Sequence, residues 1–378
     1  SYNHIENAGG GGVNATGIIY GIYGGSGNIS DGTINVNFNN LVLSQGATST
    51  TYYTYIITPT TNLSVSNNNF SSGAMGSNTL YMMYLSSITP NMTISGNSTA
   101  LGINKTGSGT FYGIYRIGTS AGAGTDIISF NNLSNITLAG TGTSYLIYSG
   151  GSASTNKEIF NNTVSTITSG TGSTYGIYAL YGNVTNMFSN SVHSINAGGI
   201  VYAMQSGGTS SGTMNTYNNI IRAITTTGGT SGSSALYGLY AATASTNNLY
   251  NNQIYDLYNT GSTGTVIGFH SASGGSVNFY NNFISDLRVE NSSSDNALVG
   301  INVAGGTQVS VFNNTVFLNG TSTSITTFGT SALYAVSTVA LDMRNNLLIN
   351  KSGRLGANGF TVAYRRNGAI TEANYLAT

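Results

Sequence analysis

The sequence predicts an all-β fold, a right-handed parallel β-helix (solenoid) of about eleven coils with roughly 31 residues per coil. An Asn-Asn pair recurs along the whole chain, and a Tyr-Gly-Ile-Tyr phrase recurs between the pairs. Stretches rich in Gly, Ser and Thr separate the two phrases. A fixed period of this size is typical of solenoids, in which each coil pairs with the next. We therefore expect each coil to contain strand, turn, strand, loop and strand.

The Asn pair marks the predicted sharp bend of each coil. One residue at such a bend often takes a left-handed conformation, which Asn tolerates, and its amide both donates and accepts hydrogen bonds. We predict a structural Asn ladder along the axis, with a glycan- or metal-binding role for these residues as the alternative. Taking the first residue of each pair, the ladder comprises Asn39, Asn68, Asn131, Asn161, Asn218, Asn251, Asn281, Asn313 and Asn345, with degenerate copies at Gly96–Asn97 and Ser189–Asn190.

Apolar residues follow the Asn pair at a fixed spacing. They occupy the third and sixth positions after its first Asn, as in Val164 with Ile167 and Ile284 with Leu287. A spacing of three between two short period-two segments indicates a bend or bulge between strands. No long stretch shows helical spacing with caps. Right-handedness is expected from the general preference of parallel crossovers.

Composition excludes several classes of function. Only 5% of residues are charged, yet 39% are hydrophobic, which predicts a folded chain and not a disordered one. Ten basic and ten acidic residues cancel, so we expect no nucleic-acid partner. The absence of Cys excludes disulfides and thiolate metal sites, and no apolar run is long enough for a membrane-spanning helix.

The Asn-pair bend, the "GTGST" loops, the "YGIY" strand and the ending "RNNLLINKSGRLGANGFTVAYRRNGAITEANYLAT" carry a family resemblance. The chain resembles right-handed parallel β-helix repeat proteins of Bacteroidetes-type bacteria, commonly exported by type IX secretion. The resemblance implies a secreted or cell-surface bacterial protein. It also indicates that residues 1–378 form a single β-helix domain excerpted from a longer chain. Further coils, self-association or a secretion or assembly partner are then the expected contacts.

The fourth residue of the Tyr-Gly-Ile-Tyr phrase forms an aromatic column. If the third residue faces the core, alternation turns the fourth outward, beside a shallow track of Gly at the second position. Such a stripe can lie beneath the protein's own loops, form a partner or self-assembly face, or contact glycans. The column comprises Tyr23, Tyr84, Tyr115, Tyr148, Tyr178, Tyr202 and Tyr240, followed by His270.

Two carboxylates, Asp256 and Asp286, occupy the same place in successive coils. Adjacent rungs would put them roughly 5 Å apart, the separation expected of a retaining glycosidase. The simpler interpretation is a pair of solvated Asp side chains neutralised by Arg288. The column is acidic in only two coils, and the three His residues show no ligand spacing, so we expect neither a metal site nor a cofactor.

The sequence therefore predicts a non-enzymatic extracellular or cell-surface protein with a structural or adhesive role, such as a stalk or filament component. Two alternatives stay open. One is a polysaccharide-active enzyme, a lyase or glycosidase, that uses Asp256, Asp286 and Arg288. The other is a glycan-binding module on the same scaffold.

Overall fold

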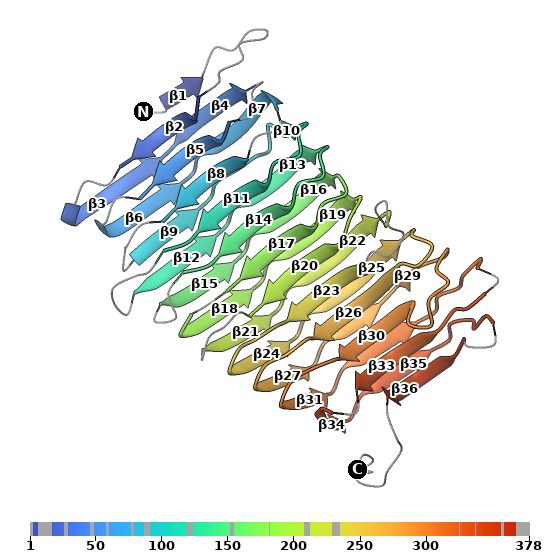
Figure 1. Cartoon of the computed structure of the whole chain (residues 1–378). Helices are drawn as coiled ribbons and strands as arrows, with labels where there is room; N and C mark the ends of the chain where they lie inside the picture. Colours follow the sequence, from blue (N-terminus) through green and yellow to red (C-terminus); the bar gives the residue numbers. More distant parts are fainter. Residues whose placement is uncertain are drawn as a thin grey trace.

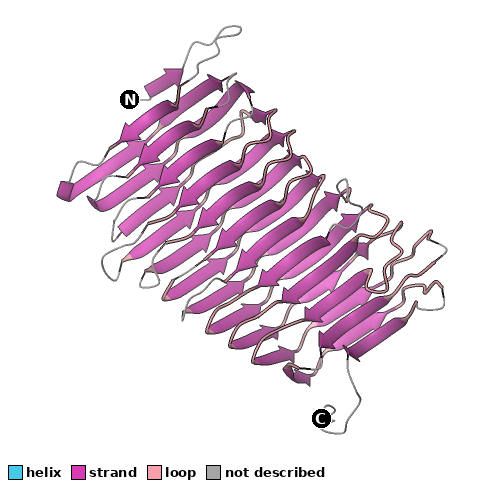
Figure 2. Cartoon of the chain, viewed as in Figure 1, coloured by secondary structure: helices cyan, strands magenta, loops and turns pink. Residues whose placement is uncertain are grey.

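The structure is a computed structural model of the chain. It describes residues 3–6, 17–25, 29–45, 49–57, 60–76, 79–86, 91–118, 124–151, 155–180, 182–207, 212–228, 235–324, 326–336, 338–356 and 359–367. Within these ranges every regular element is a β-strand, and the strands stack as one elongated parallel solenoid (Figures 1 and 2). The predicted fold class is thus confirmed. The final "EANYLAT" lies outside the described residues.

Three parallel sheets run the length of the solenoid, and we name them A, B and C. Along the chain each coil contributes one strand to sheet B, then to sheet C, then to sheet A. Among the described residues, eleven such sets account for 33 strands, and β1, β36 and the split-off β29 bring the total to 36. The prediction of about eleven coils from the sequence is therefore confirmed.

Sheet B holds the Tyr-rich phrase in 12 strands. They are β2 (Ile19–Gly24), β5 (Thr51–Ile56), β8 (Leu80–Leu85), β11 (Phe111–Arg116), β14 (Ser144–Ser149), β17 (Thr174–Ala179), β20 (Val201–Ser206), β23 (Ala235–Ala241), β26 (Thr265–Ser271), β30 (Leu298–Val303), β33 (Thr330–Val336) and β36 (Thr361–Asn367). In most of these strands the second and fifth residues face outward, and the two residues between them face the core. Strict alternation is therefore broken once in each strand.

Sheet C precedes the Asn bend and has 11 strands. They are β3 (Ile29–Asn37), β6 (Thr60–Ser66), β9 (Asn91–Ser95), β12 (Thr125–Ser129), β15 (Asn156–Phe160), β18 (Val184–Phe188), β21 (Thr213–Tyr217), β24 (Thr246–Tyr250), β27 (Ser276–Tyr280), β31 (Gln308–Phe312) and β34 (Ala340–Arg344). From β15 to β27 the strands alternate cleanly between outward and buried residues.

Sheet A follows the Asn bend and has 13 strands. They are β1 (Asn3–Glu6), β4 (Asn39–Gln45), β7 (Asn69–Met75), β10 (Ile103–Lys105), β13 (Asn132–Leu138), β16 (Thr163–Ser169), β19 (Ser191–Ala197), β22 (Ile220–Thr226), β25 (Gln253–Asn259), β28 (Phe283–Ser285), β29 (Leu287–Arg288), β32 (Thr315–Leu318) and β35 (Leu347–Asn350). The strands β28 and β29 both pair with β25, so they form one interrupted rung.

A left-handed residue interrupts sheet A in six successive coils, where the spacing of three in the sequence predicted a bulge. Val164 and Ile167, on either side of it, are both buried. Each fully buried aliphatic side chain stabilises the core by about 1.5–3 kcal/mol. The bulge residues have φ between 47° and 57°: Asn135, Thr166, Ser194, Ala223, Asp256 and Asp286.

Glycine allows the tight turns from sheet A to sheet B to stack backbone on backbone. A Cβ at Gly170 would lie 2.0 Å from the carbonyl oxygen of Gly140, and one at Gly140 would lie 2.1 Å from that of Gly107. Such distances are far inside contact, so only Gly fits at these positions. The Gly residues of the "GTGST" loops are therefore required because the backbones of neighbouring coils lie too close together for a side chain.

A buried Asn ladder runs along the corner between sheets C and A. At its centre, Asn219 donates from Nδ2 to Oδ1 of Asn252 in the next coil at 3.0 Å and to the carbonyl of Met187 at 2.9 Å. Its own Oδ1 accepts the backbone N–H of Asn190 at 2.9 Å and the side-chain amide of Asn190 at 3.1 Å. Both donors and both lone pairs of the amide are satisfied without water.

The ladder differs from the predicted one by a single residue in six coils. It runs through Asn39, Asn68, Asn97, Asn131, Asn162, Asn190, Asn219, Asn252, Asn282, Asn314 and Asn346. The prediction is wrong for Asn161, Asn218, Asn251, Asn281, Asn313 and Asn345, which precede the ladder with φ between 53° and 56°. These six supply the left-handed bend, and the second Asn of each pair supplies the amide. Bend and amide are thus two roles for two neighbouring residues.

The two roles predict that the same substitution destabilises the fold at one residue of the pair and is tolerated at the other. Asn219→Asp removes both donated hydrogen bonds and places a carboxylate against two acceptor oxygens, so we expect a loss of about 3 kcal/mol or more. Asn218→Asp is the matched control, because its side chain is exposed and Asp tolerates a left-handed backbone. Thermal unfolding and amide hydrogen exchange at pH 7 measure both. Equal destabilisation by the two variants would contradict the assignment.

Candidate functional site

Two columns of Tyr stand side by side on the outer face of sheet B. The second residue of each strand pairs in register with its equivalents, and so does the fifth. The first column contains Tyr20, Tyr52, Tyr81, Tyr112, Tyr145, Tyr175, Tyr202 and Tyr237. The second contains Tyr23, Tyr55, Tyr84, Tyr115, Tyr148 and Tyr178, then Gln205, Tyr240 and His270. We call these 15 Tyr residues the double tyrosine ladder.

The predicted column is corrected in three ways. Tyr202 belongs to the first column, because Gln205 occupies the second-column position of that coil. The other seven residues of the first column and Tyr55 were missed, since strict alternation would have turned only one Tyr of each phrase outward. The Gly between the columns faces the core: a Cβ on Gly113 would lie 3.0 Å from the side chain of Leu133. There is accordingly no outer Gly track along this face.

Stacking hides the ring faces of the first column. Consecutive rings lie 4.6–5.2 Å apart between centroids, with interplanar angles of 2–11°. Such offset stacks turn each ring face toward a neighbouring ring. The surface offered to a partner therefore consists of ring edges. Sugar stacking needs a free ring face, so this arrangement disfavours it along the middle of the column.

Partial burial disfavours the ionised form of several ladder phenols. It raises the pKa of Tyr52, Tyr112 and Tyr237 to about 12, with neighbouring phenols adding to the shift. A phenolate in the ladder would be both desolvated and close to other phenols, so the neutral form is favoured. At neutral pH the double tyrosine ladder is an uncharged surface.

Sheet C carries a second pair of outer columns that the sequence analysis did not identify. One is an amide ladder in which Asn278 donates to Asn248 and Asn248 to Asn215, each at 2.9 Å. It continues through Asn186 to the carboxylate of Glu158 at 2.7 Å. The other is a stack of Phe160, Phe188, Tyr217, Tyr250 and Tyr280, with centroids 4.9–5.0 Å apart. Each member of this stack directly precedes the Asn bend, which was a usable signal in the sequence.

The structure brings Asp256, Asp286 and Arg288 together at the interrupted rung of sheet A. The guanidinium of Arg288 pairs with Asp256 and lies 3.2 Å from Asp286, measured from Nε to Oδ1. It also lies over the ring of Tyr258, 5.3 Å from the centroid. Both Asp residues have the left-handed backbone of the bulge column, which Asp tolerates well. A backbone requirement and a partly exposed ion pair thus account for both carboxylates.

A groove of about 400 Å³ lies beside this cluster. Its lining includes Asp286, Arg288 and Glu290 from one coil and Phe317 and Asn319 from the next. The phenol of Tyr258 donates to Glu290 at 3.2 Å. A carboxylate, a cation and an aromatic ring therefore meet in the lining of one groove.

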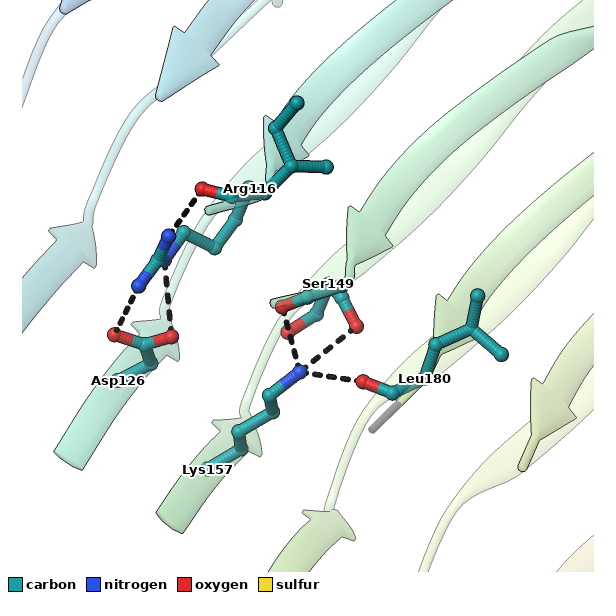
Figure 3. A network of polar contacts seen from close by, with 7 residues as sticks. Arg116, Asp126, Ser149, Lys157 and Leu180 are labelled. Atoms are coloured by element: carbon teal, nitrogen blue, oxygen red, sulfur yellow. Dashed lines mark hydrogen bonds and ion pairs between the residues drawn. The ribbon is translucent and has the colours of Figure 1, made fainter. Parts of the chain in front are cut away.

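Charged groups are also buried at the corner between sheets B and C (Figure 3). Arg116 is fully buried and holds the buried Asp126 with two bonds, 3.0 Å from Nε and 3.3 Å from a terminal nitrogen. Bidentate pairing of this kind satisfies the planar guanidinium and compensates for the loss of water. The pair therefore anchors the start of sheet C to the end of sheet B in that coil.

Lys157, one coil further on, is fully buried without a paired carboxylate of its own. Its Nζ donates to the carbonyls of Ser149 and Gly150 at 3.1 and 2.7 Å and also to that of Leu180 (Figure 3). Burial lowers the pKa of Lys157 to about 7, because the charged form is deprived of water. The amine caps backbone carbonyls of two coils, a structural role.

Among the residues that the structure describes, no group of three or more His, Cys, Asp or Glu could hold a metal ion, and no helix could span a bilayer. The fold and its outer columns define a parallel β-solenoid repeat protein. No family model, curated protein or solved structure matches the chain.

The Lys157 amine predicts a pH-dependent stability. Its pKa is about 7 when folded and about 10.4 when unfolded, so between these values the unfolded chain binds more protons. This group's contribution to stability therefore rises as pH increases from 7 toward 10. We expect the thermal midpoint of the wild type to rise relative to that of Lys157→Met between pH 7 and 9.5. A constant difference between the two proteins would contradict the lowered pKa.

The bulge column predicts that backbone preference outweighs charge at Asp256. Asp256→Asn keeps a residue that tolerates φ of 54° and loses a partly exposed ion pair, so we expect at most about 1 kcal/mol of destabilisation. Asp256→Val places a β-branched residue in the left-handed region and should cost about 1–2 kcal/mol more. Thermal melts at low and high salt separate the two effects. A larger loss in the Asn variant would show that the charge matters more to stability than the backbone conformation does.

Proposed function

We propose that the protein is a non-enzymatic extracellular or cell-surface scaffold with a structural or adhesive role, such as a stalk or filament component. The observation that carries the proposal is the first Tyr column, which is continuous over eight consecutive strands of sheet B. A periodic row of ring edges suits contact with an extended, repetitive surface. A small ligand would need a concave pocket.

The export route and the source of the protein belong to the same proposal. The resemblance to type IX secretion cargo of Bacteroidetes-type bacteria supports a secreted or surface location. Further coils of the same polypeptide, other copies of the chain, or a secretion or assembly partner are the proposed neighbours. A formal net charge of zero offers little electrostatic protection against association, which favours self-assembly.

A polysaccharide-active enzyme is the second candidate. It is favoured by the groove beside Asp286, Arg288 and Glu290, because a carboxylate pair on adjacent rungs is the minimum for glycoside hydrolysis. Against it, Arg288 pairs with both Asp256 and Asp286, so both carboxylates are already engaged by a cation of the chain itself. A binding module for glycans would use the same groove without turnover.

One experiment separates these functions. The chain is incubated with a panel of neutral and acidic polysaccharides, and both retained protein and released sugar are measured. We expect retention without turnover, and weaker retention of a triple variant in the first column, Tyr81→Phe, Tyr112→Phe and Tyr145→Phe. This variant removes hydroxyls at the ring edges and keeps the stack. Tyr217→Phe on sheet C is the matched control and should behave as the wild type.

Turnover that is lost in Asp286→Asn would overturn the non-enzymatic proposal in favour of the enzyme. Saturable retention that depends on Arg288 but not on the Tyr hydroxyls would instead identify a glycan-binding module at the groove. Light scattering over a range of protein concentrations tests the assembly role separately. We expect the mean mass to rise with concentration, and a concentration-independent monomer would contradict self-assembly.

A further inference from the structure

We propose that the double tyrosine ladder is a site of oxidative modification, where a one-electron oxidant joins neighbouring phenols as dityrosine. The first bond is expected between Tyr112 and Tyr115. These two rings come from the same strand, β11, and face outward together on sheet B. The proposal does not depend on the adhesive role, because it concerns chemistry among the chain's own residues.

This pair is the closest in the double tyrosine ladder. The two ring centroids lie 4.4 Å apart with the planes tilted by 51°. In dityrosine the two rings are joined through carbons next to the hydroxyls and are twisted relative to each other. Tyr112 and Tyr115 are already tilted, whereas stacked pairs such as Tyr145 and Tyr175, with centroids 4.6 Å apart and planes 11° from parallel, must first turn out of the stack.

The ladder also supplies every phenoxyl radical with a partner. Along the first column, neighbouring rings are never more than 5.2 Å apart, and rings of the two columns within one strand are 4.4–5.5 Å apart. An electron vacancy formed on one phenol can therefore pass to the next ring in contact. Oxidation at an exposed member such as Tyr23, 59% accessible, can be transmitted to the closest pair.

Both rings of the pair are within reach of solvent. Tyr112 and Tyr115 are partly buried residues on the outer face of β11, so part of each ring is accessible. Tyr53 provides the contrast within the same sheet, because it points into the core and donates its hydroxyl to the Ser71 carbonyl at 2.6 Å. An oxidant in solution would thus reach the ladder and not Tyr53.

The reaction is balanced with a peroxide and a peroxidase as the oxidising system. Each of two phenols loses one electron and one proton to give a phenoxyl radical. The radicals form a carbon–carbon bond between positions next to the hydroxyls, and two ring hydrogens shift to oxygen to restore both phenols. Hydrogen peroxide accepts the two electrons and two protons and becomes two molecules of water.

The proton released in each oxidation gives the reaction a pH dependence. Burial, followed by the neighbouring Tyr115 and Tyr145, raises the pKa of Tyr112 to about 12, so the phenol is neutral at physiological pH. Loss of the electron must then be accompanied by loss of the proton to water at the ring edge. The rate of coupling should therefore begin to increase at a higher pH than it does for free tyrosine, whose pKa is about 10.

Trypsin provides a direct readout of the first bond. Lys105 and Arg116 flank a peptide of residues 106–116 that contains both Tyr112 and Tyr115. Coupling within it removes two hydrogen atoms from the peptide mass and abolishes fragment ions between the two residues. The experiment treats dilute chain with peroxidase and hydrogen peroxide, follows dityrosine fluorescence, and maps the tryptic peptides.

We expect the doubly dehydrogenated peptide to appear first, with a rate per molecule that is independent of protein concentration. Tyr115→Phe should lose this product, because Phe cannot form a phenoxyl radical, while its retained ring preserves the stack. Tyr255→Phe in sheet A is the control and should leave the product unchanged, and circular dichroism confirms that both variants are folded. Dityrosine found only in covalent dimers, or oxidation that leaves residues 106–116 unmodified, would overturn the proposal.

Discussion

The buried amide ladder between sheets C and A is the interaction on which the remaining structure depends. Each ladder Asn before Asn346 bonds to the coils on both sides, as Asn219 does with Asn190, Met187 and Asn252. A slip of one residue would leave these amides unsatisfied in the core and would turn every side chain of the neighbouring strand to the other face. The ladder thus fixes the register of each coil against the next. The tyrosine, aromatic and outer amide columns are aligned only because that register is kept.

The solenoid and most of its core could be predicted from the sequence, because a repeat places equivalent residues inward in every coil. The prediction failed where two adjacent residues of the same type have different roles, and where a strand departs from strict alternation. The second Asn of a pair, such as Asn219, could not be distinguished from Asn218 by type, since the bend and the amide both favour Asn. The Tyr phrase was assigned one outward residue because a strand was assumed to alternate, whereas Tyr112 and Tyr115 both face outward around two buried residues.

The polar clusters show a different limit of sequence reasoning. Asp256 and Asp286 were expected to be neutralised by Arg288, and both pair with it. Arg116 and Asp126 are joined across the corner between two sheets, and Lys157 is satisfied by carbonyls from other segments. Such contacts depend on the path of the intervening loops, which no periodicity encodes. Only 5% of the residues are charged, yet three of them are buried at this corner in adjacent coils. These three side chains therefore hold the corner together and do not contribute to solubility.

The coil-to-coil hydrogen bonds lie along the axis of the solenoid, and this has a mechanical consequence. A force applied between the two ends loads the rungs in series, because each coil contacts mainly its neighbours. The rung with the fewest bonds then sets the tensile strength. In the part of sheet A that the structure describes, the rung whose strands pair the fewest residues is that of the short β10 with β7, which joins only two residue pairs. Since the ladder amides before Asn346 bond to the coils on both sides, separation of one rung also loosens the next, so the rod should fail abruptly and not stretch gradually.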